Sequence, residues 1–252
     1  MIKDVVINLE HQVARDPARD FAISIAEICD THLVAFAYIP EFPGYVVLEL
    51  PPDIVAQMTA ASEKSVVAAI ERFDAAAKRS LISAEHRLLR TRGAEAPTIL
   101  ATLARRFDLS VFMQSEPGRV DNDDMIETAL FQSGRPLIVV PYIQKGGLKL
   151  GRVVCCWDGS RAAARAFNDA LPLLTRANTV DLLIVLNEKT NRKNKEVRGV
   201  EMAKHLARHD VKVRLERIAA PDIDVTSAIL SYVADNSGTL IVMGRLRPFQ
   251  TA

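Results

Sequence analysis

The sequence contains few aromatic residues, few cysteines and no excess of either charge, and each shortage excludes a class of protein. Aromatic residues make up 6% of the 252 positions while 49% are hydrophobic, so the apolar content is mostly Ala, Val, Leu and Ile. Such a mixture favours helices packed on a buried parallel sheet. The three cysteines are an odd number, which argues against a disulfide framework and favours a reducing compartment.

Charge and hydropathy exclude two kinds of partner. The 32 Lys and Arg residues nearly balance the 31 Asp and Glu residues, and no basic stripe stands out, so we expect no nucleic-acid partner. No apolar run reaches the ~18 residues that a membrane span needs. The first residues lead directly into a strand pattern and not into a signal peptide. We therefore expect a soluble cytoplasmic protein with no membrane partner.

Internal repetition is the main positive feature of the sequence. At an offset of 146 residues, Arg19–Ala22 lies over Arg165–Asn168. At an offset of 130 residues, Ile99-Leu100 lies over Ile229-Leu230. Both blocks keep the same order and phase of apolar strands and amphipathic helices. The sequence therefore predicts two copies of one α/β unit.

Each predicted unit alternates buried strands with amphipathic helices, which implies right-handed crossovers and a doubly wound parallel sheet. The strands expected in the first copy are Val5–Ile7, Leu33–Ile39, His86–Arg90, Ser110–Gln114 and Pro136–Tyr142. Those expected in the second copy are Val153–Cys156, Val180–Leu186, Val211–Ile218 and Leu240–Gly244. We expect a first domain over residues 1–143, a linker over 144–151, and a second domain over 152–252 that lacks the last helix and strand.

Three segments resemble the universal stress protein (Usp) family. They are the strand and helix VVCCWDGSRAAARAFNDALPLL at Val153–Leu174, the strand Leu240–Gly244, and the turn into a strand at Ser133–Pro141. The resemblance implies five parallel strands per unit in the order 3-2-1-4-5, so the fold class is a tandem Rossmann-like α/β protein. It also implies stress-linked regulation and, in one branch of the family, ATP binding.

The resemblance implies a candidate adenine-nucleotide site in the second copy. An Asp after strand one contacts the nucleoside in ATP-binding members, and Asp158 occupies that position. Val185 matches a residue that lines the base, and Gly244 matches the first glycine of a Gly-x2-Gly-x9-Gly-Ser/Thr phosphate loop. Gly159 and Ser160 complete the turn after Asp158. The alternative interpretation is that Asp158, Gly159 and Ser160 form only a turn and a helix cap.

The phosphate half of that loop is missing from both copies. A phosphate loop needs glycines because backbone N–H groups must approach phosphate oxygens closely. In the second copy Arg247 replaces the second glycine, and the sequence stops before the third. In the first copy strand one ends in Asn8-Leu9-Glu10, and four acids stand where the loop would lie. These acids are Glu116, Asp121, Asp123 and Asp124. We expect them to repel a triphosphate, and ATP or AMP then remains a candidate cofactor of the second copy alone.

Two further clusters have weaker interpretations. His205 and His209 have the i, i+4 spacing of metal ligands, but Lys204 and Arg208 beside them favour a solvated helix face, so we expect no metal. Cys155-Cys156 lies within an apolar strand, where we expect both thiols to be buried and unreactive.

The sequence supports three functions. The leading hypothesis is a non-catalytic, ligand-responsive regulatory protein of the stress response, whose small-molecule or protein partner is unknown. The second is an adenine-nucleotide-binding stress protein, with slow ATPase or self-phosphorylation activity. The third is an interaction scaffold. A homodimer through Leu137–Val140 is also expected, because an apolar edge strand invites pairing.

Overall fold

A computed structural model describes residues 1–13, 15–41, 48–118, 122–186, 199–220 and 223–244. The chain divides into two compact units, Met1–Leu148 (unit 1) and Lys149–Ala252 (unit 2). The division falls inside the predicted linker 144–151. Leu148 stays with unit 1 because its side chain is 5% exposed and its backbone N–H donates a 2.6 Å hydrogen bond to Ser24 Oγ.

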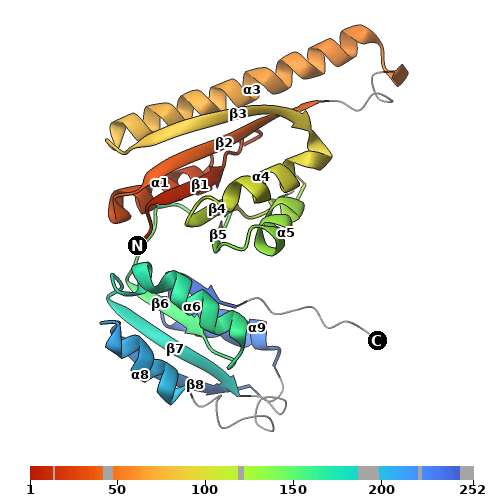
Figure 1. Cartoon of the computed structure of the whole chain (residues 1–252). Helices are drawn as coiled ribbons and strands as arrows, with labels where there is room; N and C mark the ends of the chain where they lie inside the picture. Colours follow the sequence, from red (N-terminus) through yellow and green to blue (C-terminus); the bar gives the residue numbers. More distant parts are fainter. Residues whose placement is uncertain (14, 42–47, 119–121, 187–198, 221–222, 245–252) are drawn as a thin grey trace. The chain divides into compact units, whose positions relative to one another are not determined.

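Unit 1 contains a five-stranded parallel sheet in the order β3-β2-β1-β4-β5 (Figure 1). Its strands are β1 (Asp4–Asn8), β2 (His32–Glu41), β3 (Ala84–Arg92), β4 (Leu109–Met113) and β5 (Leu137–Val140). β5 is shorter than the predicted Pro136–Tyr142. Prolines flank it on both sides, at Pro136 and Pro141, and a proline has no N–H to donate to a ladder.

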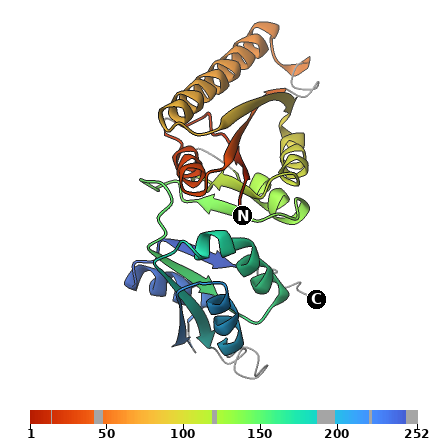
Figure 2. The same ribbon diagram turned by 60° about the vertical axis from the view of Figure 1, so that its left-hand side comes forward.

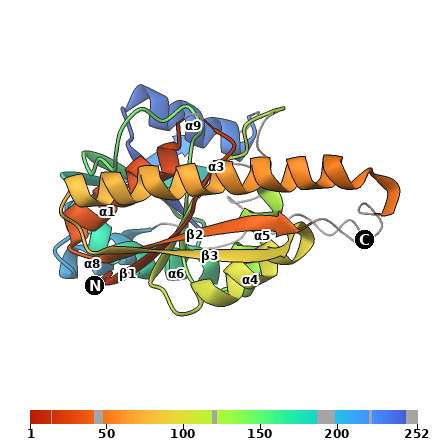
Figure 3. The same ribbon diagram turned by 90° about the horizontal axis from the view of Figure 1, so that it is seen from above.

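Helices cover both faces of the sheet of unit 1 (Figure 2). They are α1 (Pro17–Cys29), α3 (Pro52–Arg79), α4 (Ala96–Ala104) and α5 (Asp123–Gln132), with a 3-10 turn, η1, at Gly93–Glu95. α4 and α5 pack on one face, where Val34, Phe36 and Phe112 form the core. α1 contacts β1, and α3 contacts β2, on the opposite face. Figure 3 shows the 28-residue α3 running along β2 and β3.

Unit 2 repeats this arrangement with one strand fewer among its described residues. Its sheet has the order β8-β7-β6-β9. The strands are β6 (Arg152–Cys156), β7 (Thr179–Leu186), β8 (Val213–Ala219) and β9 (Leu240–Met243), and the helices are α6 (Arg161–Leu174), α8 (Val200–Arg208) and α9 (Val225–Asp235). One core cluster lies under α6 and α8, and another under α9.

The strand registers confirm the internal repeat. Ile7 of β1 pairs with Ala35 and Val111, while Val154 of β6 pairs with Asp181 and Ile241. Residues 35 and 181 differ by 146, and residues 111 and 241 differ by 130. These are the two offsets of the sequence repeat, so both blocks occupy equivalent positions and point to equivalent faces of the two sheets.

Within the described residues, unit 2 has no counterpart of α5 and β5, and this leaves apolar surface uncovered. Leu100 of α4 is 1% exposed because it packs in the cluster that includes Met125 and Ala129 of α5. Leu230, the equivalent residue of α9, is 56% exposed. Met243 at the end of β9 is 44% exposed. The shortened second unit predicted from the sequence is therefore confirmed for the part of the chain that the structure describes.

A search of the described residues finds no helix with the length and apolar character to cross a membrane.

Candidate functional site

The most distinctive polar cluster lies at the carboxyl end of β1 in unit 1. Glu10 is 6% exposed, and its Oε1 accepts hydrogen bonds from Asn8 Nδ2 at 2.9 Å and from Asn122 Nδ2 at 2.8 Å. Asn122 Nδ2 also donates to the carbonyl of Met113 at the end of β4. The cluster therefore joins β1, β4 and the start of α5. In open α/β sheets this junction, where the strand order reverses, is the usual place for a ligand.

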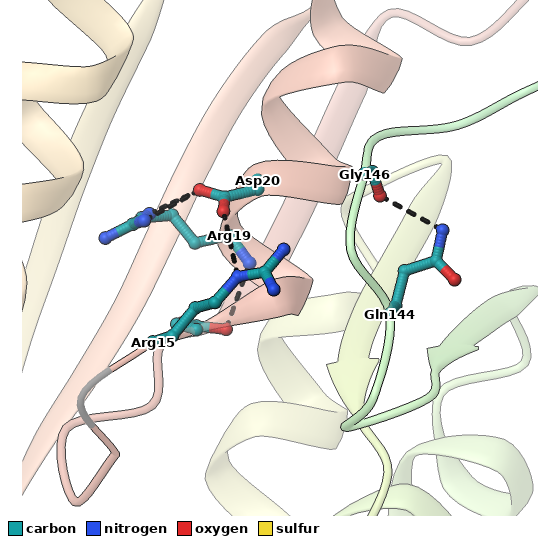
Figure 4. A network of polar contacts seen from close by, with 6 residues as sticks. Arg15, Arg19, Asp20, Gln144 and Gly146 are labelled. Atoms are coloured by element: carbon teal, nitrogen blue, oxygen red, sulfur yellow. Dashed lines mark hydrogen bonds and ion pairs between the residues drawn. The ribbon is translucent and has the colours of Figure 1, made fainter.

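A second buried carboxyl group holds the loop after β1 in place. Asp16 is the N-cap of α1, and its two oxygens accept from the backbone N–H groups of Arg19 and Glu10. Asp16 is 4% exposed. In the first turn of α1, Asp20 pairs with the guanidinium groups of Arg19 and Arg15 (Figure 4). Figure 4 also shows Gln144 Nε2 donating to the carbonyl of Gly146, in the segment that leads to Leu148.

Burial sets the titration of both carboxyl groups. Desolvation raises the pKa of Glu10 from 4.5 to about 7, and the charge of Asp16 adds to this, while hydrogen bonds from Asn122 and Asn8 lower it. Desolvation likewise raises the pKa of Asp16 from 3.8 to about 6, although backbone donors and Arg19 oppose the shift. Glu10 therefore changes charge near neutral pH, which is unusual for a carboxylate.

A small cavity of about 50 Å³ opens beside Glu10. It is lined by Asn8, Leu9, Glu10, His11, Gln12, Tyr38 and Asn122. Asn8 is 3% exposed, and its Oδ1 is buried without a hydrogen-bond partner among the described residues. The cavity can hold water molecules, which need about 30 Å³ each, but it is well below the roughly 300 Å³ of a typical drug-sized ligand pocket.

Of the acids predicted to block a phosphate loop, Asp123 and Asp124 lie at the start of α5 and Glu116 lies in the loop after β4, while Asp121 is outside the described residues. Asp123 Oδ1 accepts a 2.6 Å hydrogen bond from Ser115 Oγ. Ser115 Oγ in turn accepts from the backbone N–H of Asn122. Asp123 and Asp124 occupy the first turn of α5, where the helix dipole favours negative charge. These contacts hold the loop after β4 and place Asn122 against Glu10.

In unit 2 the predicted site begins in a turn and a helix cap. Asp158 Oδ1 accepts a 2.9 Å hydrogen bond from the backbone N–H of Ser160. Ser160 is the N-cap of α6, and its hydroxyl accepts from the backbone N–H of Ala163. Gly159 between them has φ 76°, a backbone conformation that residues other than Gly, Asn and Asp rarely adopt. This geometry is that of the turn-and-cap interpretation.

The other two predicted residues of unit 2 lie at the same edge of its sheet. Val185, near the end of β7, is 8% exposed and belongs to the core cluster under α9. Gly244 follows β9 and lies against the start of α6, where a Cβ would overlap the backbone of Ala162 and Ala163. Gly244 thus has a packing reason to be glycine. Asp158 and Gly244 follow β6 and β9, Val185 lies near the end of the neighbouring β7, and the role of the three in nucleotide binding stays a prediction.

One of the two thiols differs from what the sequence predicted, while the histidines lie exposed as expected. Cys155 is buried, but Cys156 is only half-buried, so the expectation that both are buried was wrong for Cys156. Burial nevertheless raises the pKa of Cys156 to about 12, and it raises that of Cys155 further. The rings of His205 and His209 lie edge to face with centroids 4.7 Å apart. No group of three metal-ligating side chains occurs among the described residues.

Two buried polar features escaped the sequence analysis. Glu10, Asn8 and Asn122 were noted only as departures from the expected motif, although polar residues directly after a buried strand could have marked them. In unit 2, Asp181 is 0% exposed in the middle of β7, and its Oδ2 accepts from Arg152 at 2.8 Å and from Tyr232 at 3.1 Å. A lone Asp inside an apolar strand was the available signal.

A wider cleft of about 510 Å³ lies at the opposite edge of the unit 1 sheet, by the amino ends of β1 and β2. Thr31, which is 4% exposed, lines it, and its Oγ1 is buried without a partner among the described residues. His32 Nδ1 and Ser83 Oγ are 2.7 Å apart beside it. Lys3, Glu27 and Asp30 give this cleft mixed charge, which selects no particular ligand.

Comparison with known proteins identifies the fold. No family model matches the sequence, and no curated protein matches it. Among solved structures, the chain is similar to a universal stress protein from Archaeoglobus fulgidus at 12% identity with a TM-score of 0.64, over 94% of this chain and 85% of that one. The chain therefore has the fold of a universal stress protein over both units, which confirms at the level of fold the resemblance seen in the sequence.

Two further similarities each cover 55% of this chain. Universal stress protein UspA from Lactobacillus plantarum matches at 13% identity with a TM-score of 0.45, over 97% of that chain. A universal stress protein family protein from Arabidopsis thaliana, solved with AMP bound, matches at 11% identity with a TM-score of 0.37, over 91% of that chain. Neither TM-score is high enough to carry an argument about a site.

Proposed function

We propose that this chain is a non-catalytic, ligand-responsive regulatory protein of the stress response. The observation that carries this proposal is the carboxyl edge of unit 1. There a doubly wound sheet has its usual ligand position, and this chain fills it with a buried carboxyl group, two side-chain amides and a cavity of about 50 Å³. The universal-stress-protein fold agrees with a regulatory role, although fold alone does not fix function.

A triphosphate does not suit this edge of unit 1. Glu10 and Asp16 are buried beside the cavity, and Asp123 and Asp124 stand at the neighbouring helix start. Negative charge there opposes an incoming phosphate, at a cost on the order of 1 kcal/mol per unscreened contact at ~4 Å in water. We therefore propose that unit 1 binds a ligand other than ATP and that the protein transfers no phosphoryl group.

Adenine-nucleotide binding in unit 2 is the second candidate function. It is favoured by the position of Asp158, Val185 and Gly244 at the carboxyl ends of three adjacent strands, β6, β7 and β9. Gly159 and Ser160 would then supply the turn beside the nucleoside. We expect any such binding to be weak, since Arg247 replaces the second glycine of the phosphate loop.

Native mass spectrometry of the freshly purified full chain tests these alternatives. A bound small molecule that is not a nucleotide, released on denaturation, is the expected result. Co-purified AMP or ATP would instead favour the second candidate. The interaction-scaffold hypothesis would be favoured by two results together. The purified chain would carry no bound small molecule, and adding a pool of metabolites would leave its melting temperature unchanged.

The proposal includes a homodimer through β5. This strand lies at the edge of the unit 1 sheet and pairs only with β4 within the described residues. Its residues Leu137–Val140 are all apolar, and Val139 is 40% exposed. The other edge strand, β3, carries Arg87, Arg90 and Arg92, which discourage pairing of two like strands. β5 is therefore the edge of unit 1 that suits a second copy.

A further inference from the structure

We propose that the cavity beside Glu10 in unit 1 is a binding site for a small protonated amine. This inference deepens the proposed ligand-responsive function and rests on it. The class of ligand follows from the hydrogen-bonding groups that line the cavity and from the acceptors among them that have no partner within the protein.

The cluster presents acceptor atoms that have no donor. The side-chain N–H groups of Asn8 and Asn122 both point at Glu10 Oε1. Glu10 Oε2 has no hydrogen bond among the described residues, and Asn8 Oδ1 is buried without a partner. Both residues line the cavity and are more than nine-tenths buried. A buried acceptor without a donor is unfavourable, so the unpaired Asn8 Oδ1 favours a ligand that donates hydrogen bonds.

An ammonium group meets this need because it carries three donors, no acceptor and a positive charge. Its charge would compensate a buried carboxylate, which is otherwise strongly disfavoured. The cavity of about 50 Å³ admits an ammonium group with a short alkyl chain but not a nucleoside. An anion would face the charge of Glu10.

The other groups around the cavity do not supply the missing charge. Burial lowers the pKa of His11, so its ring is neutral near pH 7, and its Nδ1 lies 3.0 Å from Ser65 Oγ. Burial and then the charge of Glu10 raise the pKa of Tyr38, which keeps its hydroxyl protonated. Arg19, whose charge acts on Asp16, pairs with Asp20. Asp123, on the α5 side, adds negative charge.

Binding should therefore depend on the charge of Glu10. A primary amine stays protonated from pH 6 to pH 8, whereas Glu10 titrates at about 7. The ionised fraction of Glu10 falls by roughly tenfold from pH 8 to pH 6, and the amine affinity should fall by the same factor.

Titration of the full-length protein with methylammonium chloride tests the site, with the side-chain amide signals of Asn8 and Asn122 followed by NMR. Ionic strength is held constant with tetramethylammonium chloride, which has no N–H donor and is too large for the cavity. We expect a saturable shift of both signals that weakens about tenfold from pH 8 to pH 6. Methanol, which has two heavy atoms like methylammonium but no charge, should give no such shift.

Glu10→Gln removes the charge while retaining size and an acceptor, so it should abolish the shift. Glu71→Gln, at an exposed position of α3, is the matched control and should leave it unchanged. The absence of a saturable shift, an equal shift with methanol, or an unchanged shift in Glu10→Gln would each overturn the amine site. Native mass spectrometry tests the ligand-responsive function separately. If it detects another bound molecule while methylammonium gives no shift, the amine site is refuted and the proposed function stands.

Discussion

The side-chain amide of Asn122 donates a 2.8 Å hydrogen bond to Glu10 Oε1, although the two residues lie 112 positions apart. The bond connects the loop after β1 with the residue that precedes α5. The same amide donates to the carbonyl of Met113 at 3.0 Å, so Asn122 spans the gap between the ends of β1 and β4. The polar cluster of unit 1 thus connects the two halves of its sheet at the point where the strand order reverses.

Stability should fall as pH rises through neutrality, because of this cluster. The folded pKa of Glu10 is about 7 against 4.5 when unfolded, so the folded state binds more protons between these values. Its contribution is therefore fully present below pH 4.5 and is lost as pH rises through 7, by about 3 kcal/mol at most. Asp16 adds to the trend, with a folded pKa of about 6. Urea unfolding between pH 5 and pH 8 measures the slope.

Glu10→Gln should flatten that slope and stabilise the protein at pH 8, since the amide is neutral at every pH. Glu71→Gln is the control and should keep the wild-type slope. A Glu10→Gln protein whose stability still falls as steeply from pH 5 to pH 8 would show that Glu10 does not carry the effect.

Gly244→Ala should destabilise unit 2 even without any ligand. The new Cβ would overlap the backbone of Ala162 and Ala163 and lie 2.8 Å from the Ala162 oxygen. Helix backbone does not yield easily, and such overpacking typically costs about 1–3 kcal/mol. Gly151→Ala is the matched control, because its Cβ would meet Thr239 Cγ2 at 3.9 Å, an ordinary contact. Equal thermal midpoints for the two variants would contradict the packing role of Gly244.

Nucleotide binding, if unit 2 supports it, should depend little on the number of phosphates. We expect AMP to compete nearly as well as ATP, because Arg247 replaces the second glycine of the phosphate loop. Asp158→Ala should weaken both nucleotides, and it would also remove the 2.9 Å hydrogen bond to the backbone N–H of Ser160. Calorimetric titration with a melting control separates the two effects. Tight Mg²⁺-dependent ATP binding that survives Asp158→Ala would place the site elsewhere.

Dimerisation should be sensitive to charge on β5 and insensitive to charge on β3. Val139→Lys places an ammonium group on the proposed shared edge, at a position that is already 40% exposed. Sedimentation should then show a monomer where the wild type is a dimer. Leu88→Lys on β3, at a position 45% exposed, is the control and should dimerise normally. A wild type that remains monomeric at high concentration would refute the β5 interface.

The fold was largely predictable because its signals are local. Continuous apolar strands such as Val153–Cys156 mark a sheet covered on both faces, and the two repeat offsets aligned equivalent strands correctly. Strand ends were less predictable. β5 stops at Leu137 and Val140 because the flanking prolines cannot extend its ladder. The sequence pattern alone had extended that strand to Tyr142.

By itself, the sequence determined the two units and their alternation of strands and helices, while the strand order followed from the resemblance to a known family. Only the tertiary structure decided what occupies the carboxyl edge of unit 1. Glu10 looked like a simple departure from a motif, and its importance depends on Asn122, which no local pattern links to it. Burial raises the pKa of a carboxyl group because the surrounding protein replaces water. That environment is assembled from β1, β2, β4 and the start of α5, and exists only once the sheet has formed.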